Sequence, residues 1–84
     1  RIKLDKLDNR LLILIKKRTT LVNEVIKLKQ YKKEIVDKKR IRFILNKIKK
    51  KTIKLNVDPK ITNRIWKNMI WSYIDYEKRN FKKK

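Results

Sequence analysis

Residues 4–28 read LDKLDNRLLILIKKRTTLVNEVIKL, and this stretch decides the fold. Its seam follows alternating intervals of three and four residues through positions 4, 7, 11, 14, 18, 21, 25 and 28, and every one is apolar except position 18. This spacing predicts one long helix with a coiled-coil-like face, over about residues 1–31. At ~1.5 Å per residue the helix would be about 45 Å long, too long for the core of a lone 84-residue globule. We therefore expect it to pack against a partner of similar length.

The composition favours helices over sheets. The 84 residues include no Gly and a single Pro, whereas sheets with tight turns usually need Gly at positive φ. A chain of this length forms one domain at most, here residues 1–84. A lone three-helix fold of this size would be marginally stable, so we expect oligomerisation.

His and Cys are both absent, which limits the chemistry available to the chain. Without them there is no disulfide framework, no thiolate metal site and no imidazole base. Any catalysis has to use carboxylates, Lys, Arg, Tyr or electrostatic stabilisation, and we expect neither a metal nor another cofactor.

The sequence carries no sign of a membrane span or a secretory signal. No apolar run reaches the roughly 18 residues that a span needs. Arg1 opens directly into the amphipathic pattern, without the apolar core of a signal peptide. We expect a cytoplasmic protein.

The formal net charge of +20 has two interpretations. One is nucleic-acid binding, because dense Lys and Arg release counterions from a polyphosphate. The other is compositional: Lys, Ile and Asn dominate together, as in a chain encoded by an AT-rich genome, and Lys outnumbers the Arg that phosphate recognition prefers. We favour the compositional interpretation and expect no nucleic-acid partner, which leaves a basic nucleic-acid-binding dimer as the non-enzymatic alternative.

Two further helices follow the long one. The pattern is interrupted at residues 32–36, and Asp37 is a suitable N-cap for the next helix. At the second boundary Asn56 can adopt the left-handed conformation, Asp58 can cap, and Pro59 suits the first helical position. The sequence therefore predicts an all-α fold with helices over about residues 1–31, 38–55 and 59–81.

Arg18 is the one charged residue in the apolar seam. A guanidinium there is unfavourable unless it reaches solvent, pairs with an acid or meets a ligand. Lys29 lies eleven residues further on, which returns it to nearly the same helix face about 16 Å away. The two cations could bracket a small anion, or each could extend to solvent from the helix surface.

Arg18 and Lys29 belong to a series of motifs that follow one another along the chain. They are Arg1-x6-Asp8-x2-Leu11-Leu12-x5-Arg18 followed by Val25-x3-Lys29, then Val36-Asp37-x2-Arg40, then Leu55-Asn56-Val57-Asp58-Pro59, and finally Trp66-x2-Met69-Ile70-x2-Tyr73-x3-Glu77. In order and spacing they resemble the all-helical, AroQ-type chorismate mutases, a family that includes the related isochorismate pyruvate lyases. The resemblance covers nearly the whole chain.

The resemblance implies conversion of chorismate to prephenate, in phenylalanine and tyrosine biosynthesis, by a Claisen rearrangement without a covalent intermediate. The arginines would neutralise the two substrate carboxylates, while Lys29 and Glu77 would flank the ether oxygen. Asp37 would accept from the substrate hydroxyl, directly or through its loop backbone, and Tyr73 would lie on the pocket wall. Arg18, Lys29 and Glu77 are the implied catalytic residues. The residues implied at the substrate are Arg1, Arg18, Lys29, Asp37, Arg40, Ile41, Tyr73 and Glu77.

The resemblance also implies an intertwined antiparallel homodimer. On one straight helix Arg1 lies seventeen residues, about 25 Å, from Arg18, too far for both to hold one small ligand. If two long helices pack antiparallel, Arg1 of one chain can arrive between Arg18 and Lys29 of the other. The two-fold axis would then fall near residues 11–13, and each of two equivalent sites would borrow one Arg1.

Two positions depart from the family pattern. Ile41 stands where the family usually has a Glu that contacts the substrate hydroxyl, and the related isochorismate pyruvate lyases tend to be apolar there. Glu77 stands where bacterial members often carry Gln, and a carboxyl group donates to an ether oxygen only when protonated. An isochorismate pyruvate lyase that forms salicylate, and an inactive or regulatory relative, are the alternatives within the family.

Overall fold

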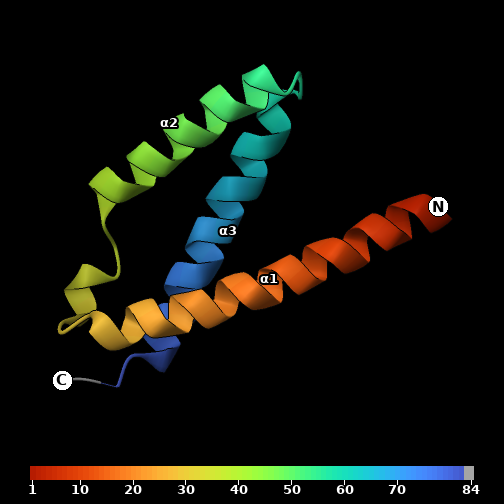
Figure 1. Ribbon diagram of the computed structural model, residues 1–84. Coiled ribbons are helices and arrows are strands. Elements are labelled where there is room, and N and C mark those ends of the chain that lie inside the picture. Colours follow the sequence, from red (N-terminus) through yellow and green to blue (C-terminus); the bar gives the residue numbers. More distant parts are fainter. Residues whose placement is uncertain (83–84) are drawn as a thin grey trace.

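The computed structural model describes residues 1–82, and the all-α fold expected from the sequence is confirmed in them. No strand occurs within this range. The second and third long helices form a hairpin, and the first crosses the third and projects beyond the hairpin at its N-terminal end (Figure 1). The elements are α1 (Ile2–Leu28), the short 3-10 helix η1 (Lys32–Glu34), α2 (Lys38–Lys54) and α3 (Pro59–Asn80).

The helix boundaries follow the capping residues. The Asp37 carboxylate accepts from the backbone N–H of Arg40 at 3.0 Å, and the Asp58 carboxylate accepts from that of Lys60 at 2.9 Å, so both predicted N-caps are confirmed. Asn56 has φ 59°, as predicted for the left-handed position before α3. The long helix ends at Leu28, earlier than expected, because the next residue has extended backbone (φ −77°, ψ 131°).

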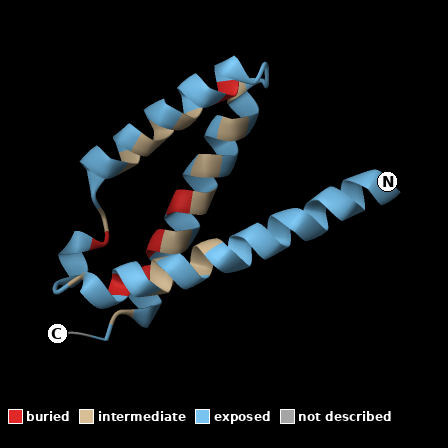
Figure 2. Cartoon of the chain, viewed as in Figure 1, coloured by how far each residue is buried: buried red, intermediate tan, exposed pale blue. Residues whose placement is uncertain are grey.

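The core lies between α2, α3 and the connection that precedes α2. Ile35, Ile70 and Ile74 are buried there and pack against partly buried side chains. Near the turn of the hairpin, the buried Thr52 hydroxyl donates to Thr62 Oγ1 at 2.8 Å, which ties the two helices together. Figure 2 shows the buried and half-buried residues on the facing sides of this hairpin and on the C-terminal half of α1. The hairpin thus holds the start of α2 beside the C-terminal half of α3.

The N-terminal half of α1 leaves its apolar face uncovered by the rest of the chain. It projects away from the hairpin, and only the C-terminal half of α1 crosses α3 (Figures 1 and 2). The first four Leu residues of the seam are 52–64% exposed, at positions 4, 7, 11 and 14. A single chain therefore leaves exposed the apolar seam that dominates the sequence pattern of α1.

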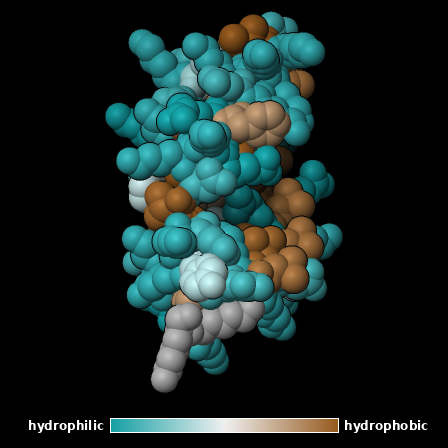
Figure 3. Space-filling model, turned by 90° about the vertical axis from the view of Figure 1, so that its left-hand side faces the viewer, coloured by the Kyte–Doolittle hydropathy of each residue, from teal (hydrophilic) through white to brown (hydrophobic). Residues whose placement is uncertain are grey.

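Lys and Arg outnumber Asp and Glu by 28 to 8. Two ion pairs join described residues, Lys29 with Glu77 and Arg79 with Asp75. On the face drawn in Figure 3, hydrophilic side chains predominate, and hydrophobic ones gather mainly along one edge. None of the described helices is both long enough and apolar enough to cross a membrane.

The cap at the start of α3 should stabilise the fold more than an exposed ion pair on the same helix. We predict that Asp58→Ala lowers the free energy of unfolding by about 1 kcal/mol, because it leaves a backbone N–H of the first turn without its acceptor. Asp75→Ala is the control, since it breaks an exposed pair and should lower that free energy by less than about 0.5 kcal/mol. Urea unfolding at one protein concentration, followed by circular dichroism, measures both; equal losses would contradict the prediction.

Candidate active site

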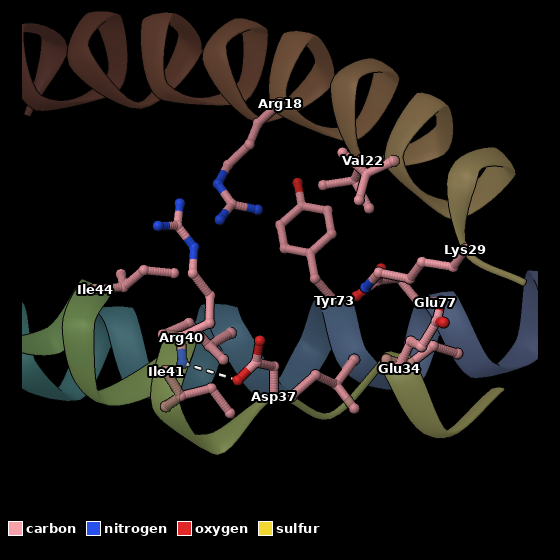
Figure 4. Close-up of a pocket in the computed structure, with 14 residues that line it drawn as sticks. Arg18, Val22, Lys29, Glu34, Asp37, Arg40, Ile41, Ile44, Tyr73 and Glu77 are labelled. Carbon is pink, nitrogen blue, oxygen red and sulfur yellow. Dashed lines mark hydrogen bonds and ion pairs between the residues drawn. The ribbon is translucent and has the colours of Figure 1, made fainter. Parts of the chain in front are cut away.

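A cavity of about 310 Å³ lies where the C-terminal half of α1, η1, the start of α2 and the C-terminal half of α3 meet. Figure 4 shows charged and apolar side chains from all of these elements converging on it. Seven of the eight residues that the sequence implied at a substrate line it: Arg18, Lys29, Asp37, Arg40, Ile41, Tyr73 and Glu77.

Arg18 enters the cavity from α1 with no acid beside it. Its Nη1 nitrogen is buried and has no hydrogen-bond partner within residues 1–82. Its guanidinium carbon lies 4.5 Å from the centre of the Tyr73 ring, and none of the described carboxylates forms an ion pair with it. A buried cationic donor without an acceptor is strongly unfavourable, so this group is suited to an anion that enters the cavity.

Arg40 approaches Arg18 from the opposite side. It lies in the first turn of α2, and its guanidinium stacks over the Phe43 ring at 5.3 Å. Figure 4 shows the two guanidinium groups pointing toward one another across the cavity. Like charges repel at such a position, and a carboxylate placed between them would replace that repulsion with charge-assisted hydrogen bonds.

Lys29 and Glu77 form an ion pair at the other end of the cavity. The Lys29 Nζ donates to Glu77 Oε1 at 2.9 Å, with 20% and 10% of the two side chains exposed. The pair joins the C-cap of α1 to the last turns of α3. A ligand oxygen in this region would meet an ammonium donor and a carboxyl group side by side.

Asp37 combines a structural role with its place in the cavity wall. One carboxylate oxygen already accepts the backbone N–H of Arg40 as the cap of α2 (Figure 4). The cap holds the first turn of α2 and therefore the backbone from which Arg40 reaches the cavity. Asp37 itself is exposed, so its carboxylate remains open to solvent and to a ligand.

Most of the remaining wall is apolar. Ile41 lies in it, at the position where the sequence departs from the family pattern. An apolar wall excludes water and strengthens the field of the cations that it surrounds. Sequence reasoning missed the rest of this wall, although Ile70 and Ile74 have the spacing of one helix face and could have been found from it. The other wall residues that were missed are Val22, Val25, Glu34, Ile35 and Ile44.

Glu34 lines the cavity although no sequence pattern indicates that it should. It lies in η1, where no helical periodicity applies, and its carboxylate accepts the backbone N–H of Gln30 at 3.0 Å. The contact folds the connection back over the end of α1. Only the path of this connection brings Glu34 to the cavity.

Arg1 is the implied residue that the chain does not bring to the cavity. It is exposed at the start of α1, and Figure 1 shows the N-terminus at the far end of that helix from η1. In the part of the chain that the structure describes, no group of three or more acidic side chains is placed to hold a metal ion. The cavity of one chain therefore presents three cations, one buried carboxylate, two exposed carboxylates and an apolar wall.

Residues 1–78 match the family model described as chorismate mutase type II. No curated protein and no solved structure matches the chain.

Proposed function

The chain belongs to the chorismate mutase type II family, and from this premise we propose that it converts chorismate to prephenate. The observation that carries the proposal is at Arg18, whose Nη1 nitrogen is buried without a hydrogen-bond partner and whose guanidinium faces Arg40 in a cavity that Lys29 also lines. Chorismate is a dicarboxylate with an ether bridge, so it needs cations for its carboxylates and a donor for its ether oxygen. We place the reaction in phenylalanine and tyrosine biosynthesis.

The rearrangement suits a chain without His or Cys. The ether C–O bond breaks as a new C–C bond forms, in one step that uses no nucleophile and moves no proton. The enzyme has to hold the compact conformer of the substrate and stabilise negative charge that grows on the ether oxygen. Fixed cations in a cavity with an apolar wall supply both by orientation and electrostatics.

Each cavity residue then has a distinct part. Arg18 and Arg40 bind the substrate carboxylates, and Asp37 accepts from the substrate hydroxyl. Lys29 leaves its contact with Glu77 in part and donates to the ether oxygen, while Glu77 approaches that oxygen from the other side. Removing one preorganised donor of this kind typically lowers kcat by about 10²- to 10³-fold.

We further propose a homodimer that completes the site. The exposed Leu residues of the seam form an apolar face on a helix that extends beyond its own hairpin. Antiparallel packing of two such helices would bury both faces and bring Arg1 of one chain to the cavity of the other. The substrate would then meet a third arginine, which no single chain provides.

Isochorismate pyruvate lyase is the second candidate, and Ile41 is the observation that favours it. This side chain lies in the cavity wall, where a chorismate mutase usually has a Glu for the substrate hydroxyl. The lyase reaction also breaks an ether bond in a cationic pocket and releases pyruvate and salicylate. The same residues could therefore serve either reaction.

A two-substrate assay separates the candidates. We expect the purified protein to form prephenate from chorismate, and we expect Arg18→Ala and Lys29→Ala to lose about 10²-fold or more in kcat/KM while circular dichroism stays unchanged. Arg64→Ala is the control, because this exposed arginine lies outside the cavity. Release of pyruvate and salicylate from isochorismate, with no prephenate from chorismate, would move the assignment to the lyase.

Mixed dimers test the borrowed arginine. Arg1→Ala and Arg18→Ala should each be nearly inactive alone. Unfolding and refolding them together in equal amounts should restore about a quarter of the wild-type activity, because half of the dimers are mixed and each has one intact site. Activity that stays at the level of the separate variants would show that Arg1 does not act across the interface.

A further inference from the structure

The Arg18 guanidinium is held in the cavity by a ring and not by an acid. Its carbon lies 4.5 Å from the centre of the Tyr73 ring, and no described carboxylate pairs with it. A ring face attracts a cation through its quadrupole but takes up few of its N–H donors. The guanidinium therefore keeps N–H donors for a ligand.

The Tyr73 hydroxyl is anchored on the helix that carries Arg18. It lies 2.6 Å from Thr19 Oγ1 and 3.3 Å from the carbonyl oxygen of Ile15, and Thr19 Oγ1 lies 2.8 Å from the same carbonyl oxygen. Thr19 directly follows Arg18 in the chain. One tyrosine thus touches two consecutive residues of α1, one through its ring and the other through its hydroxyl.

This arrangement fixes where the guanidinium can go. The hydroxyl contacts hold the ring at one height along α1, and the ring then restricts the long, flexible side chain of Arg18 to the cavity side. Apolar packing contributes little at this level of α1, since Ile26 is the one buried residue of that helix. Removing the hydroxyl should loosen the ring without removing it.

We infer that Tyr73 is a positioning residue, which orients Arg18 toward a substrate carboxylate through a ring contact anchored at Thr19. The inference rests on the proposed function and adds to it a residue that acts through another. Tyr73 then determines how accurately Arg18 is oriented toward the carboxylate, whereas a residue that only lines the wall would affect the shape of the cavity alone.

A neighbouring tyrosine provides a matched control. The Tyr76 hydroxyl donates to Asn23 Oδ1 at 2.7 Å, so it also joins α3 to α1, but Tyr76 is outside the cavity wall. The two rings meet edge to face at 6.4 Å. Tyr76→Phe therefore removes one helix-to-helix hydrogen bond of the same kind and leaves the Arg18 contact in place.

Steady-state kinetics with chorismate test the inference. We expect Tyr73→Phe and Thr19→Val each to lower kcat/KM about fivefold, and Tyr73→Leu about tenfold or more, while Tyr76→Phe stays within about twofold of wild type. In an Arg18→Lys background, Tyr73→Leu should have little further effect, because the two changes then disturb one interaction. Equal losses from Tyr73→Phe and Tyr76→Phe, or additive losses with Arg18→Lys, would overturn the inference.

A second measurement does not depend on turnover. In nitrogen-15 NMR spectra, the Arg18 Nε–H signal, assigned by its loss in Arg18→Lys, should be displaced by the Tyr73 ring current. Tyr73→Leu should abolish the displacement, and Tyr76→Phe should preserve it. A signal that Tyr73→Leu leaves unchanged would overturn the inference, whereas absent turnover in wild type with the displacement intact would overturn only the proposed function.

Discussion

The crossing of α1 over α3 is the contact on which the candidate site depends. Arg18 lies in α1 and Lys29 caps its C-terminus, whereas Tyr73 and Glu77 lie in α3, so the register of one helix on the other decides whether the four meet. Directional contacts set that register, including the tyrosine hydroxyls and the Lys29–Glu77 pair at 2.9 Å. Hydrogen bonds of this kind weaken steeply with distance and angle, so they specify one register where sparse apolar packing would allow several.

The cavity separates its charges in a way that suits the binding of an anion better than the stability of the chain. Arg18 and Arg40 face each other without an acid between them, while the buried carboxylate lies at the other end with Lys29. An apolar wall strengthens this repulsion, and it therefore also strengthens the binding of an anion that relieves the repulsion. Such strain at a site is expected where function and stability compete.

A single chain is also incomplete in a second respect. The N-terminal half of α1 has an uncovered apolar face, and the exposed Arg1 lies at its end. One antiparallel partner would address both, since covering the face would carry Arg1 toward the other cavity. Assembly and catalysis would then depend on the same helix.

By itself the sequence determined the three helices, the caps at Asp37 and Asp58, and the left-handed Asn56, because periodicity and capping depend on residues close together in the chain. Motif order also named seven residues that meet in one cavity. Only the tertiary structure decided that the Arg18 guanidinium rests on Tyr73 and that Lys29 pairs with Glu77. It also decided that Glu34 and six apolar side chains beyond Ile41 and Tyr73 complete the wall. These contacts join residues dozens of positions apart, and their geometry depends on how helices cross and how a loop returns, which no local pattern records.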